Sequence, residues 1–92
     1  MGATRSERHV AWGRAIRELR AERGLSQERL ALDAGLDRTY VSGIERGERN
    51  PSLTNLLKLG DVLGVRLSEV AARAETEAPS GDTRPEAKTR RR

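Results

Sequence analysis

Cysteine and phenylalanine are absent from this chain of 92 residues, and Trp12 and Tyr40 are its two aromatic residues. Without cysteine the chain can form no disulfide and no thiolate metal site, which fits a reducing cytosol. So few aromatics argue against stacking on single-stranded nucleic acid. No apolar run is long enough for a signal peptide or a membrane span. We therefore expect a cytoplasmic protein with no membrane partner.

Residues that carry catalysis are also scarce. The chain has one histidine, no glycine-rich phosphate loop and no pair of acids on an evident cleft. A length of 92 residues accommodates one small domain, without a second catalytic or ligand-sensing domain. We therefore expect neither an enzyme nor a protein that uses a metal or another cofactor.

The charge balance favours a polyanionic partner only weakly. There are 18 basic and 14 acidic residues, which gives a formal net charge of +4. Mixed charges on this scale are also typical of an ordinary solvated surface. Charge alone therefore does not separate a nucleic-acid-binding protein from a merely soluble one.

The spacing of apolar residues predicts an all-α fold, a compact bundle of five short helices. Residues 1–8 are small or polar and should be flexible, and the first helix then runs from about His9 to Arg23. Residues 75–92 contain two prolines and scattered charges but no large aliphatic side chain, so we expect a disordered tail. The folded domain is therefore predicted to span residues 9–74.

A helix, a tight turn and another helix are predicted in the middle of the chain. Ser26 is a good N-cap for a second helix that ends at Ala34, and Gly35 supplies the turn. Asp37 is expected to cap the third helix through its carboxylate, and Gly47 ends that helix. Two short helices joined in this way form a helix-turn-helix unit.

The later helices are expected to complete the core around this unit. Val41 and Ile44 are the predicted buried anchors of the third helix. A fifth helix runs from about Leu67 to Ala74. The fourth helix is expected to present an apolar stripe to the core, formed by Leu53, Leu56, Leu57 and Leu63.

Short motifs in a fixed order run through most of the chain. They are Ile16-Arg17, Leu19-Arg20, Gly24-Leu25-Ser26-Gln27, Leu30-Ala31, Ala34-Gly35, Ile44-Glu45-Arg46-Gly47, Pro51-Ser52-Leu53 and Leu63-Gly64-Val65. In this order they resemble the phage repressor and Cro-like regulators of the XRE family, over roughly residues 10–74. Residues 37–40 and 43–46 are especially similar to restriction-modification controller proteins. The resemblance implies a bacterial or phage transcriptional regulator that is associated with the nucleoid through DNA.

Side chains that would read DNA bases gather at the start of the third helix. If this helix enters the major groove with its N-terminus first, Arg38, Thr39 and Ser42 lie within reach of base edges. Arg38 can donate two hydrogen bonds to guanine, and Thr39 can contact a base through its hydroxyl or its methyl group. Gly43, on the same exposed face, would allow close approach to the bases.

A second set of residues is expected to position the protein on the DNA backbone. The resemblance implies that Gln27, at the start of the second helix, contacts a phosphate. It also implies a structural ion pair between Arg20 and Glu45, for which an exposed pair of little energetic value is the competing interpretation. For Tyr40 the alternative role is packing at the rim of the core. For Arg46 it is that of a favourable positive charge near a helix C-terminus. The further backbone contacts are expected from Tyr40, Arg46, Arg49, Asn50 and Ser52.

The expected assembly is a homodimer on double-stranded DNA. One recognition helix contacts only a few base pairs, whereas a two-fold dimer reads an inverted repeat. The alternative function is an antitoxin-type module that mainly binds a protein, and the candidate protein partners are a toxin or RNA polymerase. The expected dimer interface is formed by the leucines of the fourth helix and the apolar face of the fifth. Its expected residues include Val62, Val65, Leu67 and Val70.

Overall fold

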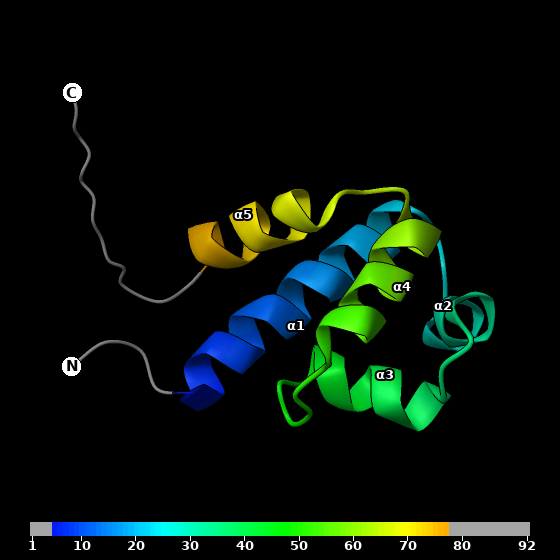
Figure 1. The fold of residues 1–92 in the computed structure, drawn as a ribbon, viewed down its shortest axis with the longest axis horizontal. Helices are drawn as coiled ribbons and strands as arrows, with labels where there is room; N and C mark the ends of the chain where they lie inside the picture. The colour runs from blue at the N-terminus through cyan, green and yellow to red at the C-terminus, as the bar shows by residue number, and fades with distance from the viewer. Residues whose placement is uncertain (1–4, 78–92) are drawn as a thin grey trace.

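The computed structural model describes residues 5–77, which fold into five α-helices without a β-strand in that range (Figure 1). The predicted all-α, five-helix class is therefore confirmed. None of these helices is both long enough and apolar enough to cross a membrane. In chain order the helices are α1 (Arg5–Glu22), α2 (Gln27–Ala34), α3 (Arg38–Glu45), α4 (Leu53–Leu63) and α5 (Leu67–Glu77).

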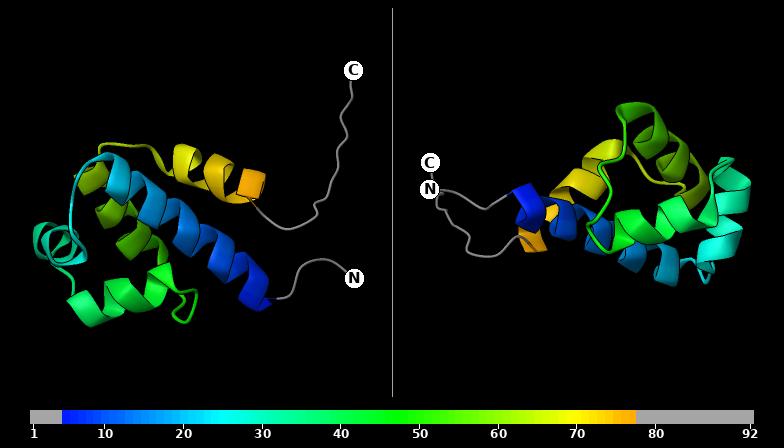
Figure 2. Two further views of the ribbon diagram at one scale, coloured as in Figure 1. Left: turned by 180° about the vertical axis from the view of Figure 1, so that it is seen from behind. Right: turned by 90° about the horizontal axis from the view of Figure 1, so that it is seen from below.

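The longest helix, α1, is the scaffold on which the others pack. α5 lies along one side of α1 and α3 along another, while α2 packs against α3 and α4 (Figures 1 and 2). The start of α1 and the end of α5 lie at one end of the molecule, and α2 lies at the opposite end. All five helices contribute to one core, whose largest fully buried side chains are Ile16, Leu30, Val41, Ile44, Leu59, Leu63 and Val70.

Two helix boundaries differ from the expected ones. α1 begins at Arg5 rather than His9, because residues 5–8 contain no glycine or proline and a charged turn can extend a helix into solvent. α5 continues to Glu77, three residues into the segment that was expected to be disordered. Within this extension the Thr76 hydroxyl donates to the carbonyl oxygen of Ala72 at 2.8 Å. Residues 1–4 and 78–92 lie outside the described residues, so the expectations for them stay predictions.

The predicted apolar stripe of α4 is partly wrong. Leu59 and Leu63 are buried in the core, whereas Leu53 and Leu57 are 63% and 47% exposed. α4 contains five leucines and a valine among 11 residues, so its composition does not single out one face. One helix face can be buried against this small core, and the remaining leucines stay in contact with solvent.

Val70 is a core residue rather than a residue of an exposed interface. Its side chain is almost completely buried, together with Ala74 one turn later on α5. The other three residues expected at the interface, Val62, Val65 and Leu67, are half-buried and pack against the core. A dimer interface can therefore use the outer parts of these three side chains but not Val70.

Candidate nucleic-acid interface

The turn between α2 and α3 has the geometry that its residues predict. The hydroxyl oxygen of Ser26 accepts the N–H of Arg29 at 3.0 Å and caps the start of α2. Gly35 ends α2 with φ at 71°, a left-handed conformation that glycine adopts without steric cost. The N–H of Leu36 then bonds to the Ala31 carbonyl at 2.8 Å. These bonds fix the angle between the two helices of the unit.

α3 is held by two buried anchors and exposes its first turn. Val41 and Ile44 are buried in the core, as predicted. Arg38 and Thr39 are exposed, and Ser42, one turn after Arg38, is half-buried. The three side chains expected to read bases are therefore together on α3, and the first two are exposed to solvent.

The expected cap of α3 is not formed. Asp37 has the extended backbone of an N-cap, but its side chain makes no capping hydrogen bond. Residues 37–39 are exposed, so water can hydrate both the carboxylate and the first N–H groups of the helix. The N-terminus of α3 is therefore open to a polar ligand.

The expected close approach of DNA at Gly43 is also wrong. Gly43 is buried, and the aliphatic stem of Arg49 lies over it, so that an added Cβ would come within 2.5 Å of the Arg49 Cγ. The chain folds back here because the N–H groups of Glu48 and Arg49 both donate to the Gly43 carbonyl, at 2.9 and 3.2 Å. Gly43 thus makes room for the protein's own loop, and Arg49 keeps an exposed end beside α3.

The predicted pairing of Arg20 with Glu45 is present and well buried. The Arg20 Nε and Nη2 atoms donate to the two carboxylate oxygens of Glu45 at 2.7 and 2.9 Å, and the Glu45 side chain is 2% exposed. Arg20 also donates to the Leu25 carbonyl at 2.8 Å. The hydrogen bond that Arg20 donates to Glu45 raises the pKa of Arg20, which stays charged. The pair therefore ties α1 to α3 and to the loop before α2.

Gln27 belongs to the same network. Its amide Nε2 donates to Glu45 Oε1 at 2.9 Å, so the first residue of α2 is fixed by the last residue of α3. An amide nitrogen carries two N–H groups, and this bond uses one of them. The second N–H and the free N–H groups of the first turn of α2 stay available to an anion.

Tyr40 and Ser52 are joined through Asn55, a residue that the sequence analysis did not identify. The Asn55 amide donates to the Tyr40 hydroxyl at 2.9 Å, and the Asn55 backbone N–H donates to the Ser52 hydroxyl at 3.1 Å. These bonds connect α3 to the start of α4, and Ser52 is the N-cap of α4. The two residues expected at the DNA backbone therefore share one partner.

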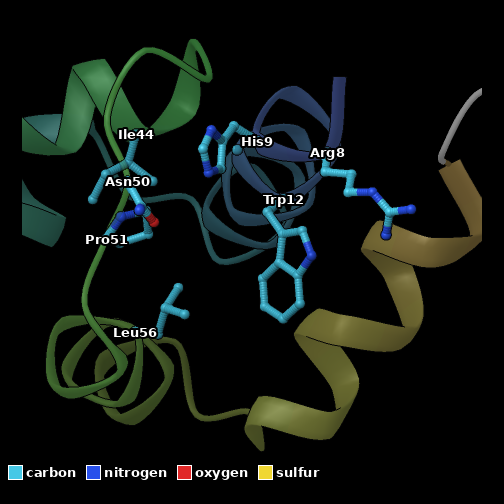
Figure 3. A pocket seen from close by; sticks show the side chains of 8 residues that line it. Arg8, His9, Trp12, Ile44, Asn50, Pro51 and Leu56 are labelled. Atoms are coloured by element: carbon cyan, nitrogen blue, oxygen red, sulfur yellow. The ribbon is translucent and has the colours of Figure 1, made fainter. Parts of the chain in front are cut away.

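Arg46 and Asn50 lie in the loop region after α3. Arg46 donates to the hydroxyl of Ser42 and to the carboxylate of Glu48, the latter at 3.0 Å. Asn50 is exposed and lines a cavity of about 200 Å³. In Figure 3 His9 and Trp12 of α1 face Asn50 and Pro51 across this cavity. Asn50 is thus the predicted backbone contact that borders the α1 side of the fold.

Gly13 is a second residue whose role the sequence analysis missed. A Cβ at this position would lie 2.2 Å from the Ile44 carbonyl oxygen and 2.7 Å from that of Glu45. Gly13 therefore lets α1 pack closely against the C-terminal end of α3. The sequence feature that could have identified Gly13 is a glycine inside a predicted helix, which usually has a packing reason. Asn55 gave no comparable signal, because its contact is with a residue on another helix.

Comparison with known proteins identifies this arrangement. Residues 16–70 match the family described as helix-turn-helix. The chain belongs to this family. It is 46% identical over 69 residues to the control protein C.MunI of a Mycoplasma species, covering 74% of this chain and 93% of C.MunI. It is also 46% identical to the control protein C.BamHI of Bacillus amyloliquefaciens, covering 62% of this chain and 72% of C.BamHI.

Solved structures of this helix-turn-helix family agree with the fold. The restriction-modification controller protein C.AhdI of Aeromonas hydrophila is 53% identical, with a TM-score of 0.67 over 67% of this chain and 94% of its own. The controller protein C.Esp1396I is 34% identical, with a TM-score of 0.70 over 76% of this chain and 92% of its own. The family match and the similarity to these relatives show that the chain is a DNA-binding regulator of the XRE type.

Proposed function

We propose that this protein binds an inverted-repeat operator as a homodimer, with α3 in the major groove. The observation that carries the proposal is the open first turn of α3. Arg38 and Thr39 are exposed there, and Arg38 makes no hydrogen bond or ion pair with another of the described residues. A planar guanidinium without an internal partner suits bidentate recognition of guanine. Ser42 lies one turn later on the same face.

Contacts to the DNA backbone are proposed for residues of α2, α3 and the segment between α3 and α4, namely Gln27, Tyr40, Arg46, Arg49, Asn50 and Ser52. The N-termini of α2 and α4 are capped by serines and add partial positive charge. Gln27, Tyr40 and Ser52 are each held by a hydrogen bond to another residue of the network described above. A preorganised set of donors loses little conformational entropy when it binds phosphates. Their joint effect should be a steep dependence of affinity on salt concentration.

The homodimer is supported by apolar surface on α4. Leu53 and Leu57 lie one turn apart and, among residues 7–76, are the most exposed large apolar residues outside α2. Leu56 beside them lines the cavity next to Trp12. When a second copy covers such an apolar surface, the surface is removed from water and the small domain is stabilised. We propose that these leucines form the centre of the interface, bordered by the half-buried Val62, Val65 and Leu67. The two copies of α3 would then reach half-sites about 34 Å apart.

The similarity to C.MunI, C.BamHI and C.AhdI supports a role as the controller of a restriction-modification operon. Operator occupancy would then follow the concentration of the protein itself. Because dimer formation is coupled to DNA binding, occupancy should rise more steeply than linearly with that concentration.

The test is selection of bound sequences from a random duplex library with the full-length protein. We expect an inverted-repeat motif with half-sites about one helical turn apart. Arg38→Ala should relax the preference at one guanine in each half-site, by about 1–3 kcal/mol. The matched control is Arg66→Ala, which removes an exposed arginine directly before α5, a helix that lies on the other side of α1 from α3 (Figure 1). A library without an enriched motif would contradict the proposal and would favour the protein-binding alternative.

A further inference from the structure

An ion pair occupies the exposed side of α3 where base and phosphate contacts are proposed to meet. Arg46 donates from Nη1 to the Ser42 hydroxyl and from Nη2 to a Glu48 carboxylate oxygen at 3.0 Å. More than half of each charged side chain is exposed. The hydrogen bond from Arg46 lowers the pKa of Glu48, so the carboxylate is charged at neutral pH. One cation therefore bridges the hydroxyl of Ser42 and a surface anion.

This arrangement conflicts with the DNA-bound roles of the same residues. A phosphate that accepts a hydrogen bond from Arg46 would sit within a few ångströms of Glu48, because both anions would contact one guanidinium. Two like charges at that separation repel each other. The hydroxyl of Ser42, in turn, is held by Arg46 in the free protein. The phosphate contact of Arg46 is therefore weakened while Glu48 holds the guanidinium, and the Ser42 oxygen has one lone pair fewer to offer to a base.

We propose that Glu48 is an internal competitor of DNA phosphate for Arg46, and that it limits operator affinity. In the free protein Glu48 holds Arg46 over Ser42. On the operator, Arg46 moves to a phosphate and the Ser42 hydroxyl is released toward a base edge. This inference rests on the proposed function, because it assigns a regulator of affinity to the same DNA-binding face.

Arg49 supplies a place for Glu48 after Arg46 has left. The stem of Arg49 lies over Gly43, and its positive charge also contributes to lowering the pKa of Glu48. Glu48 can therefore turn from one arginine to the other without losing a cationic neighbour. This exchange keeps the carboxylate from facing the phosphates unpaired, and it couples a phosphate contact to a base contact through one side chain.

The variant that isolates this competition is Glu48→Gln, which keeps the size of the side chain and removes its charge. An exposed ion pair has a small stabilising effect, so its loss should raise operator affinity about two- to fivefold. The gain should depend on Arg46, because the competition acts through that guanidinium. It should therefore disappear, or nearly so, when Arg46 is replaced by alanine.

The experiment measures the dissociation constant for the selected operator by fluorescence anisotropy at one ionic strength. Four full-length proteins form a double-mutant cycle: the natural sequence, Glu48→Gln, Arg46→Ala and the double variant. Glu75→Gln, an exposed acid on α5 away from α3, controls for the change in net charge. We expect Glu48→Gln to bind about two to five times more tightly, and the double variant to bind like Arg46→Ala.

Each other outcome has a definite meaning. If Glu48→Gln binds no more tightly than the natural sequence or Glu75→Gln, or gains equally without Arg46, this inference is overturned while the proposed function stands. If the natural sequence binds no duplex, the proposed function is overturned and the inference with it. Far-UV circular dichroism of each variant establishes that its helices are intact before binding is compared.

Discussion

Gly13 sets the distance between α1 and α3, and this makes it sensitive to the smallest possible side chain. In Gly13→Ala the new Cβ would meet the backbone carbonyls of Ile44 and Glu45, which cannot turn away as a side chain would. We expect a loss of about 1–3 kcal/mol in the free energy of unfolding, measured by urea denaturation. Alanine is normally the better helix former by about 1 kcal/mol, so any loss is due to packing.

The control for Gly13→Ala is the replacement of an exposed alanine by glycine on the same helix. Ala21→Gly removes a Cβ from a solvent-facing site of α1 and should cost about 1 kcal/mol through helix propensity alone. If Gly13→Ala were as stable as the natural sequence, α1 and α3 would have to separate easily. The contact between Gly13 and the Ile44 carbonyl would then not hold the two helices in place.

The buried pair of Arg20 and Glu45 is the residue-scale feature with the largest expected energetic effect. Arg20→Met would leave the Glu45 carboxylate buried, with Gln27 as its remaining hydrogen-bond donor. We expect a loss of about 3–5 kcal/mol in stability. The exposed pair between Arg29 and Asp33 is the comparison, because Arg29→Ala should cost less than about 1 kcal/mol.

A double variant tests whether the loss in Arg20→Met comes from the unpaired charge of Glu45 or from lost packing. Arg20→Met combined with Glu45→Met removes both charges, and it should recover most of the stability that Arg20→Met loses, because no unpaired charge stays buried. Thermal unfolding of the natural sequence, Arg20→Met, Glu45→Met and the double variant measures the coupling between the two residues. If the double variant is no more stable than Arg20→Met, the loss comes from packing rather than from an uncompensated carboxylate.

At the scale of the helix, the two N-caps of the helix-turn-helix unit differ in what they contribute. Ser26→Ala removes the acceptor of the Arg29 N–H and should destabilise the protein by about 1 kcal/mol. Asp37→Ala removes a side chain that makes no capping bond, so it should change stability by less than about 0.5 kcal/mol. Equal losses in the two variants, measured by urea denaturation, would show that Asp37 does cap α3 in solution.

Helix existence was easier to predict than helix faces and ends. All five helices follow from apolar spacing and from glycines such as Gly35, because these are local properties of the chain. The buried face of α4 was wrong in part, because Leu53 and Leu57 are indistinguishable from Leu59 without knowledge of what packs against them. The cap at Asp37 failed for a similar reason, since residue type permits a hydrogen bond but does not fix its geometry.

At the scale of the whole molecule, the candidate site depends on contacts between distant segments. The pairing of Arg20 with Glu45 was available only from family resemblance, and the links from Gln27 to Glu45 and from Asn55 to Tyr40 were not predicted at all. Such contacts arise when α1, α2, α3 and α4 meet, so no local pattern in the sequence encodes them. The residues that α3 exposes could be predicted from the sequence, whereas the contacts that hold α3 against α1, α2 and α4 could not.

The proposed assembly also belongs to this scale, and α4 provides its test. Leu57→Glu places a charge on the exposed apolar surface of α4 and should convert the dimer into a monomer, because an unpaired carboxylate would be buried between the two copies. Operator affinity should then fall by about tenfold or more. Leu32→Glu is the matched control, because Leu32 lies on α2 and, at 70%, is the most exposed large apolar residue in the part of the chain that the structure describes. Sedimentation equilibrium distinguishes the outcomes: a dimeric Leu57→Glu protein would move the interface away from these leucines, whereas a monomeric Leu32→Glu protein would move it to α2.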